Sequence, residues 1–471
     1  MEILHVTAEC YPVAKAGGLG DVAGALPKYE QHHGHNVKLI MPYYSTKFVH
    51  ESEWETDYTG RTNLGDYFFS YKILKEKTNK LGFTLYLVEI HGLLDRPKIY
   101  GYDDDAQRFI AFQICVANWL RQWHHKPGIV HCHDYHAGLL PFIFKYCYDY
   151  NSLSDIPTIL TIHNAEYQGW LDWNKSVWLP RYDLWKTGLL EWNNVINPLA
   201  SGIKNAWAVT TVSPSYMREL RHNSNGLEDL FEYEKGKCTG ILNGIDTELW
   251  NPKTDTYIEA NYDIAGAAKG KQANKEVLCN EFGLNIEKPL FIFIGRLVGE
   301  KAADVLPDAV KTILWETQQA ANFLVLGSGD PFVEDRLEEI KYIYPESYNF
   351  YKGYNERLSH QMYAGADFLL MPSRVEPCGL NQMYSLRYGT MPLVRRTGGL
   401  IDTVIDIGDA GYGICFNHAN IEDIKHAVNR AIGIYQSKKM LYAYRKKMMQ
   451  IDNSWDNTVE KYIDLYQQFI S

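Results

Sequence analysis

The chain has 471 residues, which is enough for two or three domains. Its residues are 46% apolar and 22% charged, as in an ordinary globular protein. Its 47 lysines and arginines and 57 aspartates and glutamates give a net charge of −10. This charge argues against binding to nucleic acid or an anionic membrane, and an anionic substrate would need a local cationic pocket.

The sequence predicts neither export nor a membrane span. Its first residues, MEILHVTAEC, have an acid at position 2 and too short an apolar run for a signal peptide. No apolar run approaches the length of a transmembrane helix. The eight cysteines are scattered and include no CxxC pair, a pattern typical of reduced thiols. We therefore expect a cytoplasmic protein.

The chain begins with a predicted buried strand (residues 2–8), a loop (9–18) and a helix with apolar residues at helical spacing. Gly18-x-Gly20-x-x-Ala23 formally matches the dinucleotide fingerprint of dehydrogenases. The loop is too long for that motif, and no acid follows about 20 positions later to bind a ribose. A glycine loop that presents Lys15 to phosphate oxygens fits better, and the alternative is a solvated loop lysine.

Two polar segments suggest metal sites. Asp103–Asp105 are three adjacent carboxylates, which converge poorly on one ion, so we predict a solvated loop. The segment HCHDYH, residues 131–136, suggests zinc. Residues 129–133, however, are predicted as a strand, in which alternate side chains face opposite ways, and no distant ligand pair completes the site. We therefore predict no metal and no other cofactor.

The next predicted strand, residues 159–162, delivers His163 and Asn164 to a loop. Taken alone, His163 would be a structural histidine. Residues 170–197 then hold five of the twelve tryptophans. These rings pack in a core or stack on glucose units, and the sequence leaves both explanations open.

The second half of the chain begins after residues 240–252, whose Asn-Gly turn and Asn-Pro pair indicate a crossing between domains. A buried strand is predicted at 290–294. Arg296 follows it directly, and Lys301 lies near the start of a helix that continues to Leu314. Two cations at the end of a parallel strand suit a diphosphate.

The segment from residue 367 to residue 400 carries the strongest functional signal. The run DFLLM, residues 367–371, predicts a buried strand, and helical spacing begins at Leu380. Between them, Gly379 lets the backbone approach a ligand, and the helix N-terminus offers N–H groups to an anion. With Glu376 beside that anion site, a nucleotide sugar fits. The alternative is a buried turn that carries a solvated glutamate.

The motifs of this segment, EPCGL (376–380), RYGT (387–390) and RRTGGL (395–400), closely resemble those of the bacterial glycogen and plant starch synthases. Four further stretches match in the same order, from the one at Lys15 to SWDNTVEKY near the C-terminus, so the resemblance covers nearly the whole chain. Members of that family are retaining glucosyltransferases with two facing Rossmann-like domains. The resemblance therefore implies an α/β fold of this GT-B type.

The resemblance also implies a role for each matching residue. In the family the lysine of K-x-G-G-L and two later cations bind the donor diphosphate, the aspartate of H-x-H-D-x-H faces the sugar, a histidine contacts glucose and a tyrosine stacks on the base. The implied catalytic residues are Lys15, Asp134, His163, Arg296, Lys301 and Glu376. The implied donor-binding residues are Lys15, Gly17, Gly18, Asn164, Arg296, Lys301, Tyr354, Cys378, Gly379 and Leu380.

By resemblance, residues 1–242 are the acceptor-side domain, 243–454 the nucleotide-sugar domain, and 455–471 a helix that crosses back to the first domain. The implied reaction moves glucose from ADP-glucose to the 4-hydroxyl at the non-reducing end of an α-1,4-glucan such as glycogen. We expect no nucleic-acid or membrane partner. The sequence leaves open whether ADP-glucose or UDP-glucose is preferred.

The chain departs from the family pattern at five positions: Ala200, Gly295, Glu300, Ala302 and Asn381 stand where the family has Lys, Ser, Gln, Gly and Thr. These departures put donor preference and affinity in doubt more than the fold. Two alternatives therefore stay open. One is a related two-domain glycosyltransferase with another acceptor, such as one that makes sucrose or trehalose. The other is a glucan-binding protein with reduced catalysis.

Overall fold

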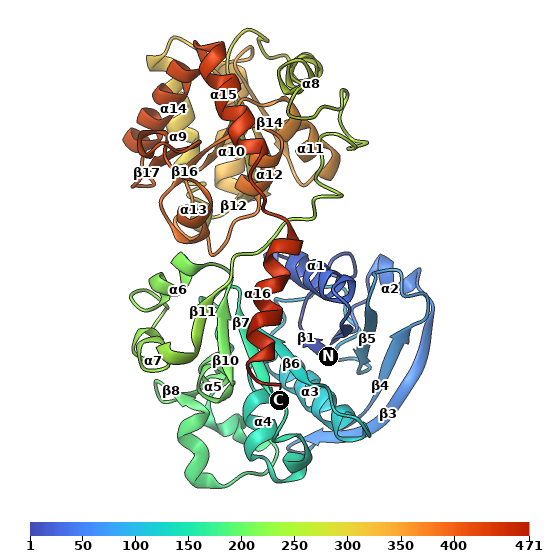
Figure 1. Ribbon diagram of the computed structural model, residues 1–471. Helices are drawn as coiled ribbons and strands as arrows, with labels where there is room; N and C mark the ends of the chain where they lie inside the picture. The colour runs from blue at the N-terminus through green and yellow to red at the C-terminus, as the bar shows by residue number, and fades with distance from the viewer. Residues whose placement is uncertain (471) are drawn as a thin grey trace. The chain divides into compact units, whose positions relative to one another are not determined.

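The computed structural model describes residues 1–470, which form two compact units (Figure 1). Unit 1 comprises Met1–Ile241 together with the segment from Trp455 onward, and unit 2 comprises Leu242–Ser454. Each unit has its own mainly parallel sheet and its own apolar core, so the predicted α/β class is confirmed. None of the helices formed by residues 1–470 combines the length and the apolar character needed to cross a membrane.

Unit 1 contains a nine-stranded sheet in the order β11-β10-β7-β6-β1-β2-β5-β4-β3. Its strands pair in parallel up to β5, and β4 and β3 are added antiparallel at one edge. A separate two-stranded ribbon is formed by β8 and β9. The strands are β1 (Glu2–Val6), β2 (Asn36–Pro42), β3 (Trp54–Leu64), β4 (Tyr67–Glu76), β5 (Thr84–Glu89), β6 (Ile129–His133), β7 (Thr158–Ile162), β8 (Glu191–Trp192), β9 (Val195–Ile196), β10 (Ala208–Thr211) and β11 (Cys238–Gly240).

The helices of unit 1 bury apolar faces against this sheet. In α1 the apolar residues whose spacing predicted the helix form its buried face. The helix α16 lies beside α1 and buries Val459, Tyr462 and Tyr466 in the same core (Figure 1). The helices are α1 (Gly18–His32), α2 (Lys47–His50), α3 (Asp105–Arg121), α4 (Leu140–Tyr146), α5 (Pro198–Asn205), α6 (Pro214–Leu220), α7 (Glu228–Tyr233) and α16 (Trp455–Gln467). Short 3-10 turns are η1 (Tyr148–Leu153), η2 (Trp173–Trp178), η3 (Leu184–Leu189) and η4 (Lys235–Lys237).

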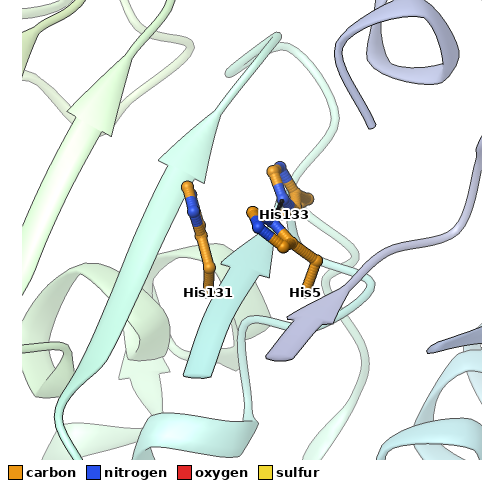
Figure 2. Close-up of side chains that lie close together, drawn as sticks. All are labelled: His5, His131 and His133. Atoms are coloured by element: carbon orange, nitrogen blue, oxygen red, sulfur yellow. Dashed lines mark hydrogen bonds between the residues drawn. The ribbon is translucent and has the colours of Figure 1, made fainter. Parts of the chain in front are cut away.

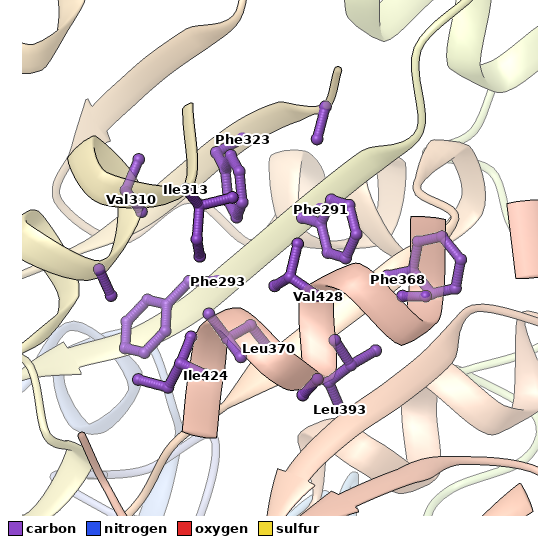
Figure 3. Close-up of a cluster of buried hydrophobic side chains, with 14 of the residues drawn as sticks. Phe291, Phe293, Val310, Ile313, Phe323, Phe368, Leu370, Leu393, Ile424 and Val428 are labelled. Atoms are coloured by element: carbon purple, nitrogen blue, oxygen red, sulfur yellow. The ribbon is translucent and has the colours of Figure 1, made fainter. Parts of the chain in front are cut away.

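Unit 2 contains a six-stranded sheet in the order β14-β13-β12-β15-β16-β17, and all its pairs are parallel. On one face of this sheet the rings of Phe291, Phe323 and Phe368 stack across neighbouring strands, and Ile424 and Val428 of α14 (Ile421–Tyr435) pack in the same cluster (Figure 3). The strands are β12 (Leu290–Leu297), β13 (Asn322–Gly329), β14 (Tyr348–Lys352), β15 (Phe368–Met371), β16 (Met391–Arg395) and β17 (Ile414–Phe416).

Five helices of unit 2 connect its strands, one precedes the first strand, and two follow the last. The first of these helices begins at Ala267. They are α8 (Ala267–Phe282), α9 (Leu306–Glu316), α10 (Pro331–Ile343), α11 (Glu356–Gly365), α12 (Asn381–Arg387), α13 (Gly398–Thr403), α14 (Ile421–Tyr435) and α15 (Lys438–Met449), with 3-10 turns η5 (Gly299–Lys301) and η6 (Ile407–Asp409).

Two features of unit 1 differ from the sequence predictions. The β3–β4 hairpin was not predicted, because β3 is polar and largely exposed along its length and gives no apolar alternation. The acidic turn at 103–105 was predicted as a solvated loop, yet only Asp103 is exposed. Asp104 accepts two hydrogen bonds from the Arg96 guanidinium at 2.6 and 2.7 Å, and Asp105 accepts one from buried Arg108 at 2.6 Å.

Candidate active site

Each sheet reverses its direction of winding at one point. In unit 1 the chain runs from β1 outward through β2 and β5, then returns to the other side of β1 with β6 and β7. In unit 2 it runs from β12 to β13 and β14, then returns beside β12 with β15. Such switch points open a crevice at the carboxyl ends of the strands, where ligands of α/β proteins bind. The predicted site residues of unit 1 follow β1, β6 or β7. Those of unit 2 lie at the end of β12, in the loop after it or in the loop after β15, apart from Tyr354, which follows β14.

The loop after β1 holds the lysine of the first predicted phosphate site. Lys15 Nζ donates to Asp21 Oδ1 at 2.7 Å, and its ammonium lies 5.6 Å from the centre of the Tyr11 ring. A Cβ added at Gly17 or Gly18 would meet no heavy atom within 4 Å, so this side of the loop is open. Lys15 therefore lies half-exposed beside open space, in contact with one carboxylate.

Glu9, which was not among the predicted site residues, organises the same loop. Its Oε2 accepts hydrogen bonds from the backbone N–H groups of Ala16 and Gly17 at 2.6 and 3.0 Å, and its Oε1 accepts one from the Tyr100 hydroxyl at 2.7 Å. Glu9 is buried. The loop thus gives two of its amides to an internal carboxylate. An acid placed directly after a buried strand, ahead of a glycine loop, was the available signal.

Asp134 follows β6 and supports the neighbouring loop. Its backbone has φ +55°, in the left-handed region, and its Oδ1 accepts the backbone N–H of His163 at 2.7 Å. Burial raises the pKa of the Asp134 carboxyl to about 7, although hydrogen bonds from the amides of His163 and Asn164 act in the opposite direction. The carboxyl group therefore joins the ends of β6 and β7, a role that the sequence did not predict.

The segment HCHDYH contributes to a buried histidine cluster. β6 is the strand that was predicted, so His131 and His133, two residues apart, share one of its faces and Cys132 between them faces the other way. His5 of neighbouring β1 joins them, and ring nitrogens of the three residues lie within 4.8 Å of one another (Figure 2). All six ring nitrogens already have hydrogen-bond partners, which a metal ion would have to displace.

The tryptophan-rich segment is not a core element. None of its five tryptophans is buried, and Trp170 and Trp185 are 59% and 74% exposed. The Lys186 ammonium lies 3.9 Å from the centre of the Trp185 ring, which holds one face of that ring in place. Between the two explanations that the sequence left open, the exposure of these rings favours surface contacts.

In unit 2 the switch point joins an ammonium and a carboxylate. Lys301 Nζ, at the end of η5, donates to Glu376 Oε2 at 2.5 Å, and the Ser373 hydroxyl donates to the same oxygen at 2.9 Å. Glu376 is buried. Arg296 lies at the end of β12, where its Nη2 donates to Glu300 Oε2 at 3.3 Å, and it is more exposed. The carboxylate is thus bound by groups from the loops after two adjacent strands.

Three glycines of the motifs are required by backbone geometry. Gly379 has φ +74°, so it makes the left-handed turn just before α12. A Cβ on Gly398 would lie 2.1 Å from the Glu376 carbonyl oxygen, and one on Gly399 would lie 2.1 Å from that of Cys378. The start of α13 therefore packs directly on the backbone of the loop that carries Glu376. The GG pair of the RRTGGL motif holds that loop in position.

The departures from the family pattern have separate structural outcomes. Ala302 has φ +53°, where a glycine would be unstrained. Asn381 donates from Nδ2 to the Ile294 carbonyl at 2.7 Å, which ties the start of α12 to β12. A Cβ at Gly295 would meet nothing closer than 3.8 Å, so a serine would fit there. Ala200 is fully buried in α5, in a setting without room for a solvated lysine.

The remaining predicted donor residues differ in exposure. Tyr354, in the loop after β14, is 76% exposed and presents its ring to solvent. Cys378 is buried, and burial raises the pKa of its thiol to about 12, so the thiol is neutral. Leu380 is half-buried at the start of α12, and Asn164 is half-buried with its Oδ1 accepting the backbone N–H of Glu166 at 3.0 Å.

Comparisons with known proteins agree with this geometry. Residues 2–233 match the family described as starch synthase catalytic domain, and residues 274–448 match the family described as glycosyl transferases group 1. A glycogen synthase from Flavobacterium johnsoniae is 51% identical over 470 residues, which cover 100% of this chain and 99% of the relative.

Two solved structures are similar to this one. The catalytic domain of starch synthase IV from Arabidopsis thaliana, bound to ADP and acarbose, is 31% identical, with a TM-score of 0.89 and 99% of both chains covered. A sucrose-phosphate synthase from Thermosynechococcus elongatus is 16% identical, with a TM-score of 0.65 over 99% of this chain and 98% of the other, and shares the fold alone. The two parallel-sheet units therefore have the predicted GT-B fold.

Proposed function

The chain belongs to the family of bacterial glycogen synthases and plant starch synthases, and on that premise we propose that it transfers glucose from ADP-glucose to an α-1,4-glucan. The acceptor is the 4-hydroxyl at the non-reducing end of the glucan, and the anomeric configuration is retained. The observation that carries the proposal is the contact between Lys301 and Glu376 at the switch point of unit 2. It joins a phosphate-binding group to a hydroxyl-binding group, as a nucleotide sugar requires.

The donor brings its own leaving group, so the protein must stabilise charge that develops as the bond to glucose breaks. Lys15, Arg296 and Lys301 neutralise the departing diphosphate, and Tyr354 offers an exposed ring to the base. The similar starch synthase IV structure from Arabidopsis thaliana is bound to ADP, which supports a nucleoside diphosphate as the product.

The glucose is held by a carboxylate and a histidine, in contrast to the cations that bind the diphosphate. Glu376 accepts hydrogen bonds from glucose hydroxyls and stabilises the positive charge that develops at the anomeric carbon, while His163 and the loop supported by Asp134 contact the sugar. The leaving phosphate accepts the proton of the attacking 4-hydroxyl, so the reaction needs no metal ion. The eight free thiols of the chain fit the reducing cytoplasm expected from the sequence.

A transfer assay tests this proposal. The protein is incubated with ADP-glucose and glycogen, with UDP-glucose and glycogen, and with ADP-glucose and monosaccharide acceptors. We expect elongation of glycogen from ADP-glucose, and α-linked product by nuclear magnetic resonance. Transfer to a monosaccharide in preference to glycogen would replace the acceptor assignment. Glucan binding without donor turnover would make the chain a binding protein.

A further inference from the structure

A continuous chain of hydrogen bonds runs through the core of unit 1 to His163. Glu30 Oε2, on α1, lies 2.6 Å from His5 Nε2. His5 Nδ1 lies 3.0 Å from His133 Nε2, and His133 Nδ1 lies 3.0 Å from His163 Nε2. Glu30, His5 and His133 are fully buried, and His163 is the first member with access to the surface. The chain thus connects four elements, α1, β1, β6 and the loop after β7.

The carboxylate of Glu30 sets the direction of this chain. A carboxylate only accepts hydrogen bonds, so His5 carries its hydrogen on Nε2 and leaves Nδ1 as an acceptor. His133 must then donate from Nε2 to His5, and His163 must donate from Nε2 to His133. A neutral imidazole carries one hydrogen only, so Nδ1 of His163 keeps its lone pair.

A second branch of hydrogen bonds begins at the other oxygen of Glu30, and its members likewise donate toward the carboxylate. The Tyr466 hydroxyl of α16 donates to Glu30 Oε1 at 2.9 Å, and it lies 2.7 Å from His131 Nδ1. His131 therefore donates to Tyr466 and accepts from the Thr161 hydroxyl, 2.6 Å from its Nε2. This branch ends on Thr210 and does not reach His163. His131 is thus as buried and as fully bonded as His5, but lies outside the chain to the sugar-binding loop.

We propose that Glu30, His5 and His133 are positioning residues that fix His163 in the tautomer with hydrogen on Nε2, so that Nδ1 accepts a hydrogen bond from a sugar hydroxyl. The geometry of the chain stands alone, and the identity of the hydroxyl donor rests on the proposed function. A histidine free to change tautomer would present either a donor or an acceptor to the sugar. The chain of hydrogen bonds from Glu30 to His163, called the relay below, removes that choice before the sugar binds. This lowers the free-energy cost of ordering the site.

Burial supports a neutral relay. Desolvation lowers the pKa of His131 and His133 well below the usual value and lowers the pKa of His163 to about 3. These rings therefore remain uncharged near neutral pH, and His133 and His163 each carry the single hydrogen that the relay assigns to them. The complete set of hydrogen-bond partners also argues for a relay instead of a zinc site.

Two matched substitutions separate a positioning role from a structural one. His5→Leu breaks the relay, and His131→Leu removes an equally buried histidine from the other branch. His5→Gln is the conservative variant, because its amide can donate to Glu30 and its carbonyl can accept from His133. Nuclear magnetic resonance of protein isotope-labelled at the histidine ring nitrogens reports the tautomer, and the His163 signal is assigned from its absence in His163→Gln.

We expect the wild type and His131→Leu to show His163 with an unprotonated Nδ1, and His5→Leu to show mixed tautomers. His5→Leu should lower kcat/KM for the sugar donor about tenfold, as expected for loss of one oriented hydrogen bond, with ADP affinity unchanged. His5→Gln should restore most of that loss, and His131→Leu should stay within about twofold of the wild type.

Three results would overturn the proposal: protonated Nδ1 on His163 in the wild type, equal effects of His5→Leu and His131→Leu on the tautomer, or stoichiometric zinc whose removal abolishes activity. If His5→Leu does not fold, the wild-type spectrum still decides the tautomer. If the wild type transfers no glucose while its spectrum shows the expected tautomer, the proposed function fails and the relay stands.

Discussion

The ammonium of Lys301 and the carboxylate of Glu376 form a 2.5 Å ion pair between the loops that follow β12 and β15. The sequence motifs predict that Lys301 binds the diphosphate of the donor and that Glu376 binds its sugar. Their contact makes the two assignments depend on each other. A diphosphate that binds Lys301 lies close to a carboxylate, and two unit charges at 4 Å repel by about 4 kcal/mol at an effective dielectric constant of 20.

Glu376→Gln is the first test of this arrangement. The amide keeps the size of the side chain and one acceptor but removes the charge, which we expect to matter most when positive charge develops at the anomeric carbon. We predict that kcat falls by about a hundredfold or more, whereas ADP binds as tightly as before. Calorimetric titration with ADP and initial rates at saturating donor check this. A collapse of ADP affinity with normal turnover would make Glu376 a nucleotide-binding or structural residue.

The three cations form the second test. Lys15→Ala, Arg296→Ala and Lys301→Ala should each slow glucose transfer by orders of magnitude in folded protein, because each removes a charge that balances the diphosphate. Combined losses should be less than additive, since all three act on one group. Lys341→Ala is the control, because Lys341 is also a half-exposed lysine paired with a carboxylate. Unchanged turnover in a folded Lys15→Ala variant would remove Lys15 from the phosphate site.

Ala302 allows a test of backbone strain. Ala302 and Ala303 are both fully buried, but only Ala302 has a positive φ, +53°. Replacing either by glycine removes a buried methyl group, whereas only at position 302 does glycine also relieve left-handed strain of about 1 kcal/mol. We therefore predict that Ala302→Gly lowers the free energy of unfolding by about 1 kcal/mol less than Ala303→Gly does. Urea denaturation of both variants measures the difference, and equal losses would contradict the strain argument.

The buried Asp134 should leave a pH signature in stability. Its pKa is raised from 3.8 to about 7 in the folded protein, so between these values the folded state holds a proton that the unfolded state has lost. The contribution of Asp134 to the free energy of unfolding therefore falls as the pH rises through that window and is constant outside it. We predict that the free energy of unfolding of the wild type decreases relative to Asp134→Asn between about pH 4 and pH 7. Exposed Asp103→Asn provides the control, and a difference that does not depend on pH would refute the shift.

The exposed tryptophans make a prediction about the acceptor. Trp185→Ala should raise the KM for glycogen severalfold and leave the KM for the nucleotide sugar unchanged, because an exposed ring that stacks on glucose units affects the glucan alone. Trp315 on α9 is the matched control, since it is 77% exposed against 74% for Trp185. Equal effects of Trp185→Ala and Trp315→Ala would show that Trp185 contributes only general surface properties.

The sequence predicted the strands and helices with strong apolar patterns, and it missed features that depend on contacts between distant segments. The spacing at Leu19–Leu26 and the run at 367–371 correspond to α1 and β15, because each buries one face or both faces in a core. In the β3–β4 hairpin, β3 is polar and largely exposed and gives no local apolar pattern, although β4 buries Tyr71 and Ile73 at alternate positions.

The same limit applies to the candidate site. Apart from Tyr354, the predicted site residues lie at the ends of β1, β6, β7, β12 and β15 or in the loops after them, as the positions of the predicted strands indicated. Glu9 was missed although its place after a buried strand and before a glycine loop was a local signal. The roles of His5 and of the pairing of Lys301 with Glu376 were not predicted, because each depends on which loops and strands become neighbours in the sheet. A lone histidine carries no such information in the sequence.

The position of α16 in unit 1 has a consequence for biosynthesis. Its Tyr466 hydroxyl completes the hydrogen bonds of Glu30, and its apolar face fills the core beside α1, yet the ribosome makes all of Leu242–Ser454 before it makes this helix. At 5–20 residues per second that interval lasts roughly ten to forty seconds. During this interval, the apolar surface of unit 1 that α16 will cover, beside Glu30, stays exposed. Nascent unit 1 is therefore a natural client for chaperones that bind nascent chains.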